Sequence, residues 1–399
     1  MYRVALVVPA LTTSGGVATV ADFLYRVLDD HPDFEPDLVS IATKSNDPLS
    51  THLRDPTTWG RRVQTEEGTW RGRPYTKVGA RLVEFEFQRY LPRPELTQRL
   101  NRYDLVQIVA GAPAWAYTAR DVDVPVALQV ATLVKVERST REASLRRPID
   151  VWRWLMTFIT SRIEQKALPH VDAVFVENDW MRRWMSECLS PQQVVFAPPG
   201  VDEAFFRPAS ESNEEADYLL SVGRFGDPRK NLPLLFSAYA QVREKIAVAP
   251  NLVLAGRTPP DDAAWEHARR LGIDDAIEFR ENIPYDELAR LYRQANLFIL
   301  SSNEEGLGLV VLEAMSSGTA VVSTNCGGPS TLIEEGETGY LVPVNDAEAL
   351  ADRIVHLLRH PESRRAMGRR GRERVERHFS QKAAGRRFTE NYHSLLESE

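Results

Sequence analysis

Two glutamates, Glu305 and Glu313, enclose seven residues that are all glycine or apolar, GLGLVVL. Gly306 and Gly308 permit a turn whose backbone N–H groups point outward with no Cβ in the way. The apolar run that follows predicts a short helix over 309–316, ended by a nearby glycine. The start of a helix concentrates unpaired N–H groups and partial positive charge, so this turn is suited to hold a phosphate.

The spacing of the two glutamates distinguishes between two kinds of site. A glycosidase holds its two carboxyl groups ~5–5.5 Å apart when it retains configuration and ~6.5–9.5 Å apart when it inverts. Eight residues of helix rise about 12 Å, so Glu305 and Glu313 fit the two ends of one long ligand better than one scissile bond. The structural alternative makes Glu305 a solvated acid at the helix start and Glu313 a surface residue.

Two cations follow another predicted strand, in the stretch SVGRFGDPRKN at 221–231. Arg224 follows the end of the predicted strand, and Lys230 comes after a Gly-Asp-Pro turn. In an open α/β sheet, ligands bind beyond the carboxyl ends of the strands. Two cations there are able to clamp a diphosphate and to offset the charge that grows on a leaving group. The alternative is a solvated loop whose charge is incidental.

The N-terminal half of the sequence predicts a doubly wound α/β domain. Val4 to Val8 is a continuous apolar run, typical of a strand buried on both faces. A polar loop at 12–16 then leads to apolar residues at helical spacing. Further apolar runs predict strands over 104–109, 124–130 and 173–176, whereas residues 43–95 are rich in arginine and aromatic residues and show less regularity.

A second α/β series follows residues 196–208, where three prolines and a glycine interrupt the periodicity. The strands are expected over 218–222, 252–255, 277–279, 297–300, 320–322 and 339–342, with helices over 232–246, 285–295, 347–358 and 380–396. Strands that alternate with helices favour parallel sheets. We therefore predict an α/β protein with two Rossmann-like, doubly wound domains that face a central cleft. Their expected bounds are 1–197 and 198–375, followed by a helical segment, 376–399, that packs back on the N-terminal domain.

Composition argues against several classes of protein. Lys and Arg number 49 against 56 Asp and Glu, for a net charge of −7, which disfavours the broad basic surface of a nucleic-acid binder. Cys188 and Cys326 have no metal-ligand spacing, so a reducing, cytoplasmic compartment is the simpler interpretation. The N-terminal apolar run is short and contains Pro9, so we expect no signal peptide. No run approaches the ~20 apolar residues that span a bilayer.

The motifs together resemble the retaining glycosyltransferases of the GT-B fold, in glycosyltransferase family 4. The resemblance covers essentially the whole chain and is most specific over residues 196–345. The matching pieces are Gly15-Gly16-Val17, GVDEAFFRP at 200–208, SVGRFGDPRKN, ANLFILSSNEEGLGLVVLEAMSSGTAVVST at 295–324 and GGPSTLIEEGETGYLV at 327–342.

The resemblance implies catalytic and donor-binding roles for the charged residues. Arg224 and Lys230 would hold the donor diphosphate. Glu313 would accept hydrogen bonds from the ribose hydroxyls, and Glu305 would contact hydroxyls of the transferred sugar. Members of the family usually work without a metal, so we predict no metal site and no cofactor. The Asp121-Val122-Asp123 triplet precedes a proline and predicts a turn rather than a metal site.

The remaining donor-binding residues act through their backbone. Gly306, Leu307 and Gly308 would cradle the sugar and the phosphate of the donor. Gly16 would let the N-terminal loop approach the phosphate across the cleft. The nucleotide base would lie near residues 280–283, which end at Ile283. We expect the donor to be a UDP- or GDP-sugar.

The sequence departs from the family in two places. Many relatives carry a histidine near the reacting sugar, but residues 124–138 contain none, and Ala131 or Thr132 would occupy its place. Either a different group supports the sugar, or the donor differs from the commonest ones, or activity is reduced. Thr331 stands where relatives often have a glutamate, and we expect that change to affect a structural turn rather than the chemistry.

The acceptor side offers two basic segments. Residues 138–162 combine arginines with large apolar side chains, as in a helix that rests on an anionic membrane beside a lipid-linked acceptor. The alternative, which we favour, is a helix packed into the core with a solvated basic face. The second segment would shape the acceptor site or bind anionic groups; its basic residues are Arg61, Arg62, Arg71, Arg73, Lys77, Arg81, Arg89 and Arg93.

The leading hypothesis is transfer of a sugar from a nucleotide diphosphate sugar to a hydroxyl of a glycan, lipid-linked or small-molecule acceptor, with retention of configuration. The donor would lie on residues 200–375 and the acceptor on residues 1–195. One alternative is a sugar-nucleotide epimerase or a phosphorylase on the same fold. Another is a non-catalytic partner that binds sugar nucleotides, which the missing histidine suggests.

Overall fold

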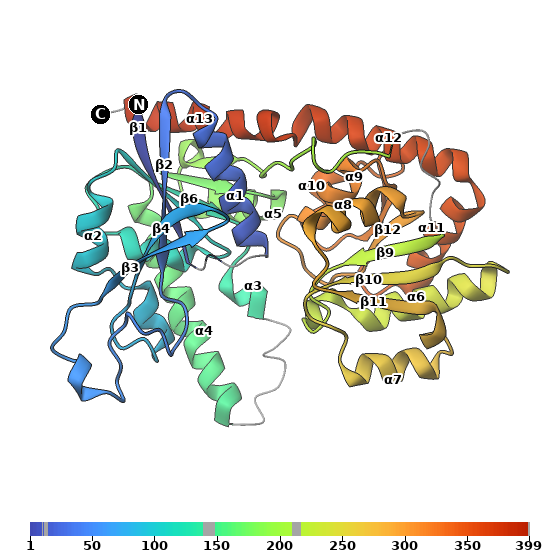
Figure 1. The fold of residues 1–399 in the computed structure, drawn as a ribbon, viewed down its shortest axis with the longest axis horizontal. Coiled ribbons are helices and arrows are strands. Elements are labelled where there is room, and N and C mark those ends of the chain that lie inside the picture. Colours follow the sequence, from blue (N-terminus) through green and yellow to red (C-terminus); the bar gives the residue numbers. More distant parts are fainter. Residues whose placement is uncertain (10, 12–14, 139–147, 210–216, 398–399) are drawn as a thin grey trace. The chain divides into compact units, whose positions relative to one another are not determined.

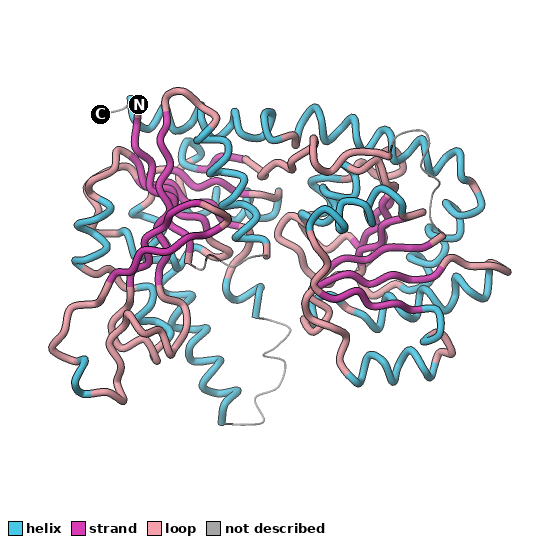
Figure 2. The backbone as a smooth tube through the Cα atoms, viewed as in Figure 1, coloured by secondary structure: helices cyan, strands magenta, loops and turns pink. Residues whose placement is uncertain are grey.

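The computed structural model describes residues 1–9, 11, 15–138, 148–209 and 217–397 (Figure 1). Contacts between backbone positions divide the chain into two compact units, Met1–Pro199 with Gly385–Glu399, and Gly200–Ala384. Each unit is built around its own sheet, and Figure 2 shows the strands of both units in magenta between cyan helices.

The first unit holds an eight-stranded sheet in the order β3-β4-β2-β1-β5-β6-β7-β8. Neighbouring strands are parallel except for β3 and β4, so the predicted parallel sheet is confirmed. The strands are β1 (Tyr2–Val8), β2 (Phe34–Ile41), β3 (Thr65–Trp70), β4 (Arg73–Val78), β5 (Leu105–Val109), β6 (Val126–Val130), β7 (Ala173–Val176) and β8 (Val194–Phe196).

Helices cover both faces of the first sheet, because alternate residues of each strand point to opposite faces. Val174 and Val176 of β7 pack with α2, α4 and α5, whereas Phe175 contacts Phe388 of α13, with ring centroids 4.8 Å apart. The helices are α1 (Gly16–Asp29), α2 (Pro94–Leu100), α3 (Val134–Arg138), α4 (Pro148–Ala167), α5 (Asp179–Cys188) and α13 (Gln381–Glu397), whose residues from Gly385 onward belong to this unit.

Residues 43–95 are more regular than the sequence predicted. β3 and β4 pair Trp70 with Arg73, so a two-residue turn at Arg71-Gly72 joins them. Both turn residues have positive φ, 52° and 79°, which suits a tight hairpin turn. The prediction was wrong here because most residues of β3 are exposed, and an exposed strand shows no apolar alternation.

The second unit holds a six-stranded sheet in the order β11-β10-β9-β12-β13-β14, and all its neighbouring strands are parallel. The strands are β9 (Tyr218–Val222), β10 (Asn251–Gly256), β11 (Ile277–Glu281), β12 (Leu297–Leu300), β13 (Val321–Thr324) and β14 (Tyr340–Val342). Successive strands are added outward from β9 in one direction and then from β12 in the other. This change of direction is the point at which open α/β sheets bind ligands.

Two core clusters pack against opposite faces of the second sheet. Leu252 and Leu254 of β10 face α6, α7 and α11, whereas Val253 faces α8, α9 and α10. Figure 1 shows α8–α10 on one side of these strands and α6 and α7 on the other. The helices are α6 (Leu232–Lys245), α7 (Asp262–Arg270), α8 (Tyr285–Gln294), α9 (Leu309–Ser316), α10 (Pro329–Leu332), α11 (Ala347–Arg359) and α12 (Pro361–His378).

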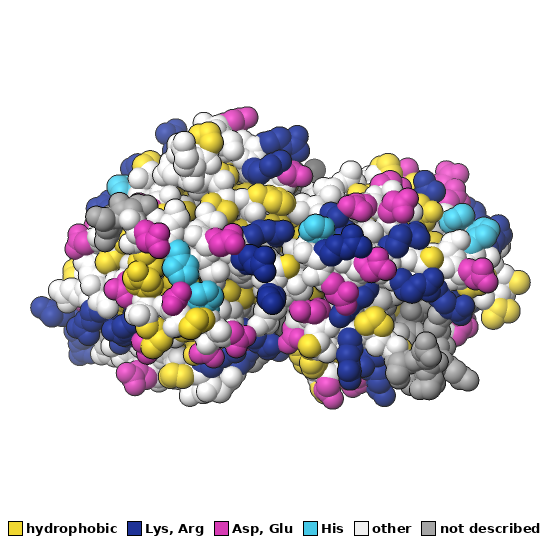
Figure 3. All heavy atoms as spheres, turned by 90° about the horizontal axis from the view of Figure 1, so that it is seen from above, with side chains coloured by type: hydrophobic (Ala, Val, Ile, Leu, Met, Phe, Trp, Pro, Cys, Tyr) yellow, Lys and Arg dark blue, Asp and Glu magenta, His cyan; other side chains and the backbone are white. Residues whose placement is uncertain are grey.

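The predicted elements are confirmed, with the same bounds for β7, β9, β12 and α9, and with ends that differ by one or two residues elsewhere. Among the elements that the sequence pattern did not predict are β2, β8, α2, α5, α7 and α12. On the face drawn in Figure 3, Lys and Arg side chains lie interspersed with Asp and Glu side chains. Within the described residues, no helix combines the length and the apolarity needed to cross a bilayer.

Candidate functional site

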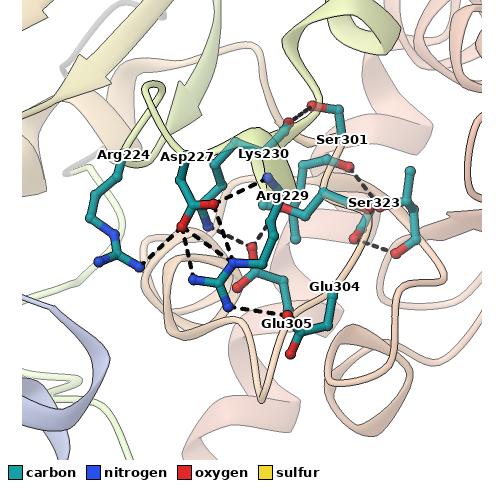
Figure 4. A network of polar contacts seen from close by, with 11 residues as sticks. Arg224, Asp227, Arg229, Lys230, Ser301, Glu304, Glu305 and Ser323 are labelled. Atoms are coloured by element: carbon teal, nitrogen blue, oxygen red, sulfur yellow. Dashed lines mark hydrogen bonds and ion pairs between the residues drawn. The ribbon is translucent and has the colours of Figure 1, made fainter. Parts of the chain in front are cut away.

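Two loops leave the carboxyl ends of β9 and β12, the strands at the change of direction in the second sheet. They comprise residues 223–231 and 301–308. Figure 4 shows side chains of both loops turned toward one another. The structure thus brings together Lys230 and Glu305, which the sequence separates by 75 positions, at the edge of the sheet where ligands bind.

Lys230 and Glu305 form an ion pair in which Nζ and Oε1 lie 2.6 Å apart, and both side chains are 15% exposed. The hydroxyl of Ser302 donates a hydrogen bond to the same Oε1 at 2.6 Å. Lys230 extends alongside Gly223, where an added Cβ would lie 3.3 Å from the Lys230 Cε. The resemblance assigned the two charged residues to different parts of a donor, and the structure adds that they contact each other.

Backbone hydrogen bonds fix the two loops to each other. The N–H of Asn303 donates to the Arg229 carbonyl at 2.7 Å, and the Ser301 hydroxyl donates to the Lys230 carbonyl at 2.8 Å. Asn231 begins α6 in the left-handed conformation, with φ 48°, and its side-chain amide donates to Asn303 Oδ1 at 2.8 Å. The position of Lys230 is therefore set from both sides.

Arg229 is a site residue that sequence reasoning missed. Its guanidinium donates to Asp227 Oδ2 at 2.8 Å and to Glu304 Oε2 at 3.1 Å. Burial alone would raise the pKa of Asp227, but hydrogen bonds and charge from Arg229 outweigh it and lower that pKa to about 2. No local pattern marks this contact, because Glu304 lies 75 positions away in the sequence.

Arg224 differs from its neighbours in exposure. Its side chain is 62% exposed, and its guanidinium approaches Asp227 Oδ2 only to 3.4 Å. Figure 4 shows the network of polar contacts that the two loops form, with Arg224 at one end and with Lys230 and Arg229 further in. Of the two predicted cations, Arg224 thus faces solvent while Lys230 is enclosed.

The glycine turn is supported from behind by the loop after β13. The N–H of Glu305 donates to the Cys326 carbonyl at 3.1 Å, and the N–H of Gly328 donates to the Glu305 carbonyl at 3.0 Å. A Cβ on Gly328 would lie 2.4 Å from the Leu307 Cα, so only glycine permits this approach. Gly308 begins α9 with φ 85°, and the predicted turn and helix start are confirmed.

Glu313 is buried rather than at the surface, so the structural alternative for this residue is wrong. It is 8% exposed, and its Oε2 accepts a hydrogen bond from the Tyr292 hydroxyl at 2.7 Å. Burial raises the pKa of Glu313 to about 7, although the Tyr292 hydrogen bond opposes that shift. The sequence analysis singled out Glu313 but not its partner, because Tyr292 lies on another helix, α8.

Cys326 is a buried residue beside the network, as expected, rather than a nucleophile. Only 7% of it is exposed. Burial, with a further contribution from the Glu305 charge, raises the pKa of its thiol to about 12. The thiolate that nucleophilic chemistry requires is therefore disfavoured at neutral pH.

Two predicted donor-binding residues lie apart from this network. Gly16 is the first residue of α1 in the first unit, and residues 12–14 of the loop before it lie outside the described part. Ile283 follows β11 and is partly buried against the core of α8 and α9. The assignment of Gly16 to the phosphate and of Ile283 to the base stays a prediction.

At both departures from the family, backbone groups are hydrogen-bonded, although the buried hydroxyl of Thr331 has no hydrogen-bond partner among the described residues. The N–H groups of Ala131 and Thr132 both donate to the Gly111 carbonyl, at 3.2 and 2.9 Å. Thr331 lies in α10 and is 8% exposed, and Arg374 donates to its carbonyl at 3.4 Å. These bonds agree with the interpretation of Thr331 as part of a structural turn.

Most of the basic residues expected on the acceptor side are engaged within the first unit. Arg71 and Arg73 both pair with Asp22, at 2.8 and 2.7 Å, and Lys77 pairs with Asp47. Arg89 and Arg93 donate to backbone carbonyls. Arg61, Arg62 and Arg81 are exposed, as is Arg71 despite its pairing with Asp22.

The segment 138–162 differs from the interpretation that we favoured. Its helix, α4, buries Met156 and Ile163, but several large apolar side chains in its first half are exposed. A helix packed in the core with only a basic face in solvent is therefore wrong for that half. Residues 139–147 of the segment lie outside the described part of the chain.

Comparison with known proteins identifies relatives of the chain. The model of the family "Glycosyl transferases group 1" matches residues 202–374. A D-inositol 3-phosphate glycosyltransferase of Kribbella flavida is 34% identical over 202 residues, 47% of each protein, so the chain spans about half the length of that relative. The enzyme of the same name from Kineococcus radiotolerans is 30% identical over 310 residues, covering 69% of this chain and 68% of that protein.

The fold has solved counterparts. Sucrose-phosphate synthase from Thermosynechococcus elongatus superimposes over the full length of both chains with a TM-score of 0.73 and 23% identity. At this identity the likeness concerns the fold alone, and it confirms the predicted GT-B fold with two Rossmann-like domains.

Proposed function

The chain belongs to the glycosyl transferases group 1, and from this premise we propose that it transfers a sugar from a nucleotide diphosphate sugar to a hydroxyl of an acceptor. Retention of the anomeric configuration and independence of metal are part of the proposal. The observation that carries it is the Lys230–Glu305 pair beside the glycine-opened start of α9. Both lie at the change of strand direction in the second sheet.

In this proposal the second unit holds the donor diphosphate. An ammonium has three N–H donors, so Lys230 keeps its bond to Glu305 while donating to a phosphate oxygen. Arg224, largely exposed, adds a second positive charge, and the start of α9 adds backbone N–H groups. Together these groups offset the negative charge on the departing nucleotide.

Glu305 orients the sugar rather than moving a proton. Lys230 and Ser302 both bind its Oε1, and we assign Oε2 to hydroxyls of the sugar. The bond between the anomeric carbon and the phosphate oxygen breaks while the acceptor oxygen bonds to the same carbon from the same face. The proton of the acceptor hydroxyl goes to the leaving phosphate, so the step needs no further base.

The acceptor in this proposal is a hydroxyl compound with an anionic group, bound by the first unit. Two relatives are named for D-inositol 3-phosphate, and Arg61, Arg62 and Arg81 face solvent on that unit. Inositol 3-phosphate, inositol and vesicle-embedded phosphatidylinositol, offered as acceptors with the same donor, distinguish a free phosphate from a lipid headgroup. Equal use of inositol and inositol 3-phosphate would remove the anionic group from the proposal.

A melting screen against UDP, GDP, ADP and dTDP sugars tests the donor, with donor consumption followed in the same wells. One nucleotide should raise Tm, and its sugar should be consumed only when an acceptor is present. An epimerised donor without acceptor points to an epimerase, and release that depends on phosphate points to a phosphorylase. Stabilisation without turnover points to a non-catalytic partner.

The double variant Arg224→Ala, Lys230→Ala tests the diphosphate role. We expect kcat to fall by about 10²-fold or more, since each donor to developing charge contributes on that order. The matched control is Arg243→Ala, Lys245→Ala, which removes two surface cations of the same unit that pair with Asp275 and Asp352. Turnover by the first variant at the level of the control would reject the role.

A further inference from the structure

The first half of α4 turns large apolar side chains to solvent. Trp152 is 44%, Trp154 is 48% and Phe158 is 42% exposed. The Trp154 and Phe158 rings stack on each other with centroids 6.0 Å apart. We call this surface the α4 patch, and its members are Ile149, Val151, Trp152, Trp154, Leu155 and Phe158.

The opposite side of α4 is unexpectedly polar. Thr157, Thr160, Ser161 and Glu164 are each at most 8% exposed. The hydroxyls of Thr160 and Ser161 have no hydrogen-bond partner among the described residues. Burying polar groups while leaving aromatic rings in water is unfavourable on both counts. The exposed aromatic side of α4 is therefore better suited to contact with surroundings that are less polar than water.

The exposed charge around the α4 patch is mainly positive. Arg153 is 60% exposed at its side chain, and Arg162 places its guanidinium 5.2 Å from the centre of the Phe158 ring. Of the two acids of α4, Asp150 faces Arg153 and Glu164 is buried.

We propose that the α4 patch docks this protein on the surface of an anionic phospholipid bilayer. Tryptophan prefers the boundary between hydrocarbon and headgroups, because its ring is apolar and its N–H is polar. Exposed arginines beside it pair with lipid phosphates. A helix that lies in the membrane interface inserts its apolar side chains only as far as the boundary between headgroups and hydrocarbon. The six exposed apolar side chains of the α4 patch are enough for such shallow insertion. A second copy of this chain fits less well, since two such patches would bring their arginines together.

Vesicle sedimentation of the full chain tests the proposal. We expect binding to phosphatidylcholine–phosphatidylglycerol vesicles about tenfold tighter than to phosphatidylcholine alone, and weaker in high salt. Trp154→Ser, Phe158→Ser should lower that binding about tenfold or more. The control Trp59→Ser removes another exposed tryptophan, 58% exposed and outside α4, and should bind normally.

The charge requirement has its own matched pair of variants. Arg153→Gln should weaken binding to the mixed vesicles, whereas Arg377→Gln, which removes a 70% exposed arginine of α12, should not. Equal binding to neutral and anionic vesicles, or full binding by the Trp154/Phe158 variant, overturns the proposal. So does self-association in solution that this variant abolishes, because a second copy would then occupy the patch.

The inference rests on the proposed function only for its purpose, which is to bring the enzyme to an acceptor at a membrane. Donor consumption with a soluble acceptor and no vesicles tests transfer separately. A protein that transfers sugar but ignores vesicles rejects docking alone. A protein that binds vesicles but never transfers rejects the proposed function alone.

Discussion

Burial and ligand binding have opposite effects on the protonation of Glu313: burial favours the protonated form, and ligand hydroxyls favour the ionised form. Its carboxyl group is almost enclosed, and Tyr292 occupies Oε2. Burial raises its pKa to about 7, so near neutral pH both protonation states are populated. Hydroxyl groups that donate to a carboxylate favour its ionised form. Binding of a ribose at this position would therefore be linked to the loss of a proton.

We predict that affinity for the nucleotide sugar rises by up to roughly tenfold between about pH 6 and pH 8. The diphosphate of a nucleotide sugar keeps its charge over this range, so calorimetric titration reports on the protein. Glu313→Gln should bind more weakly at the higher pH and lose most of this dependence. The control Glu337→Gln, at a 70% exposed side chain, should keep it. A pH profile like the wild type in Glu313→Gln would remove the ribose from this residue.

Glu177 is a second buried acid, and its effect is on stability. It follows β7, is 5% exposed, and accepts a hydrogen bond from the Gln129 amide at 3.0 Å. Burial raises its pKa to about 7, which the Gln129 hydrogen bond opposes. The folded state therefore binds more protons than the unfolded state between the two pKa values, so stability falls as the pH rises from about 4.5 to about 7 and levels off above that.

We predict that Glu177→Gln stabilises the protein at about pH 8 by on the order of 2 kcal/mol and has little effect near pH 5. An increase of a few degrees in Tm at the higher pH is the expected readout. The control Glu187→Gln changes an exposed glutamate of α5 and should have no such pH-dependent effect. If Glu177→Gln destabilises equally at both pH values, ionisation of Glu177 is not the cause.

At the scale of elements, Arg229 joins the loop after β9 to the loop after β12. Its guanidinium forms an ion pair with Asp227 in the first loop and with Glu304 in the second. Asp227 is 7% and Glu304 is 16% exposed at the side chain. Lysine carries the same charge but not the planar fork that reaches both acids. Arg229 is thus a positioning residue, since the neighbouring Lys230 is the one that we assign to the donor.

We predict that Arg229→Lys lowers stability by about 1–3 kcal/mol and kcat by about tenfold, while KM for the donor changes less. Urea unfolding and steady-state kinetics check the two effects. The matched control is Arg243→Lys at a surface pair with Asp275, expected within about 0.5 kcal/mol of the wild type. A rise in KM for the donor with kcat unchanged would mean that Arg229 binds the donor instead of positioning Lys230.

How far the sequence predicts these elements depends on how strongly each element is buried. β7, β9, β12 and α9 consist mostly of apolar residues that lie in the core clusters of the two units, so hydrophobicity alone marks their bounds. β2 contains Pro36, which resembles a break, and β3 is mostly exposed. The sequence predicted that Lys230 and Glu305 both follow strand ends at one edge of the sheet, but it did not predict that they contact each other. The Arg229–Glu304 contact depends on how two loops fold, which local spacing does not encode.

At the scale of the whole molecule, the chain forms two compact units, each with its own sheet, and the proposed donor site lies within one of them. A ligand that binds only the folded state of one unit stabilises that unit, by ~2.7 kcal/mol at 100 times its Kd.

We therefore predict that scanning calorimetry resolves more than one cooperative transition and that the nucleotide sugar moves only one of them upward. Glu313→Gln should reduce this shift at equal ligand concentration, and Glu177→Gln, in the other unit, should leave it intact. A single transition that rises as a whole would mean that the two units unfold together. The ligand would then stabilise both units together, and the second unit would not bind its donor as an independent domain.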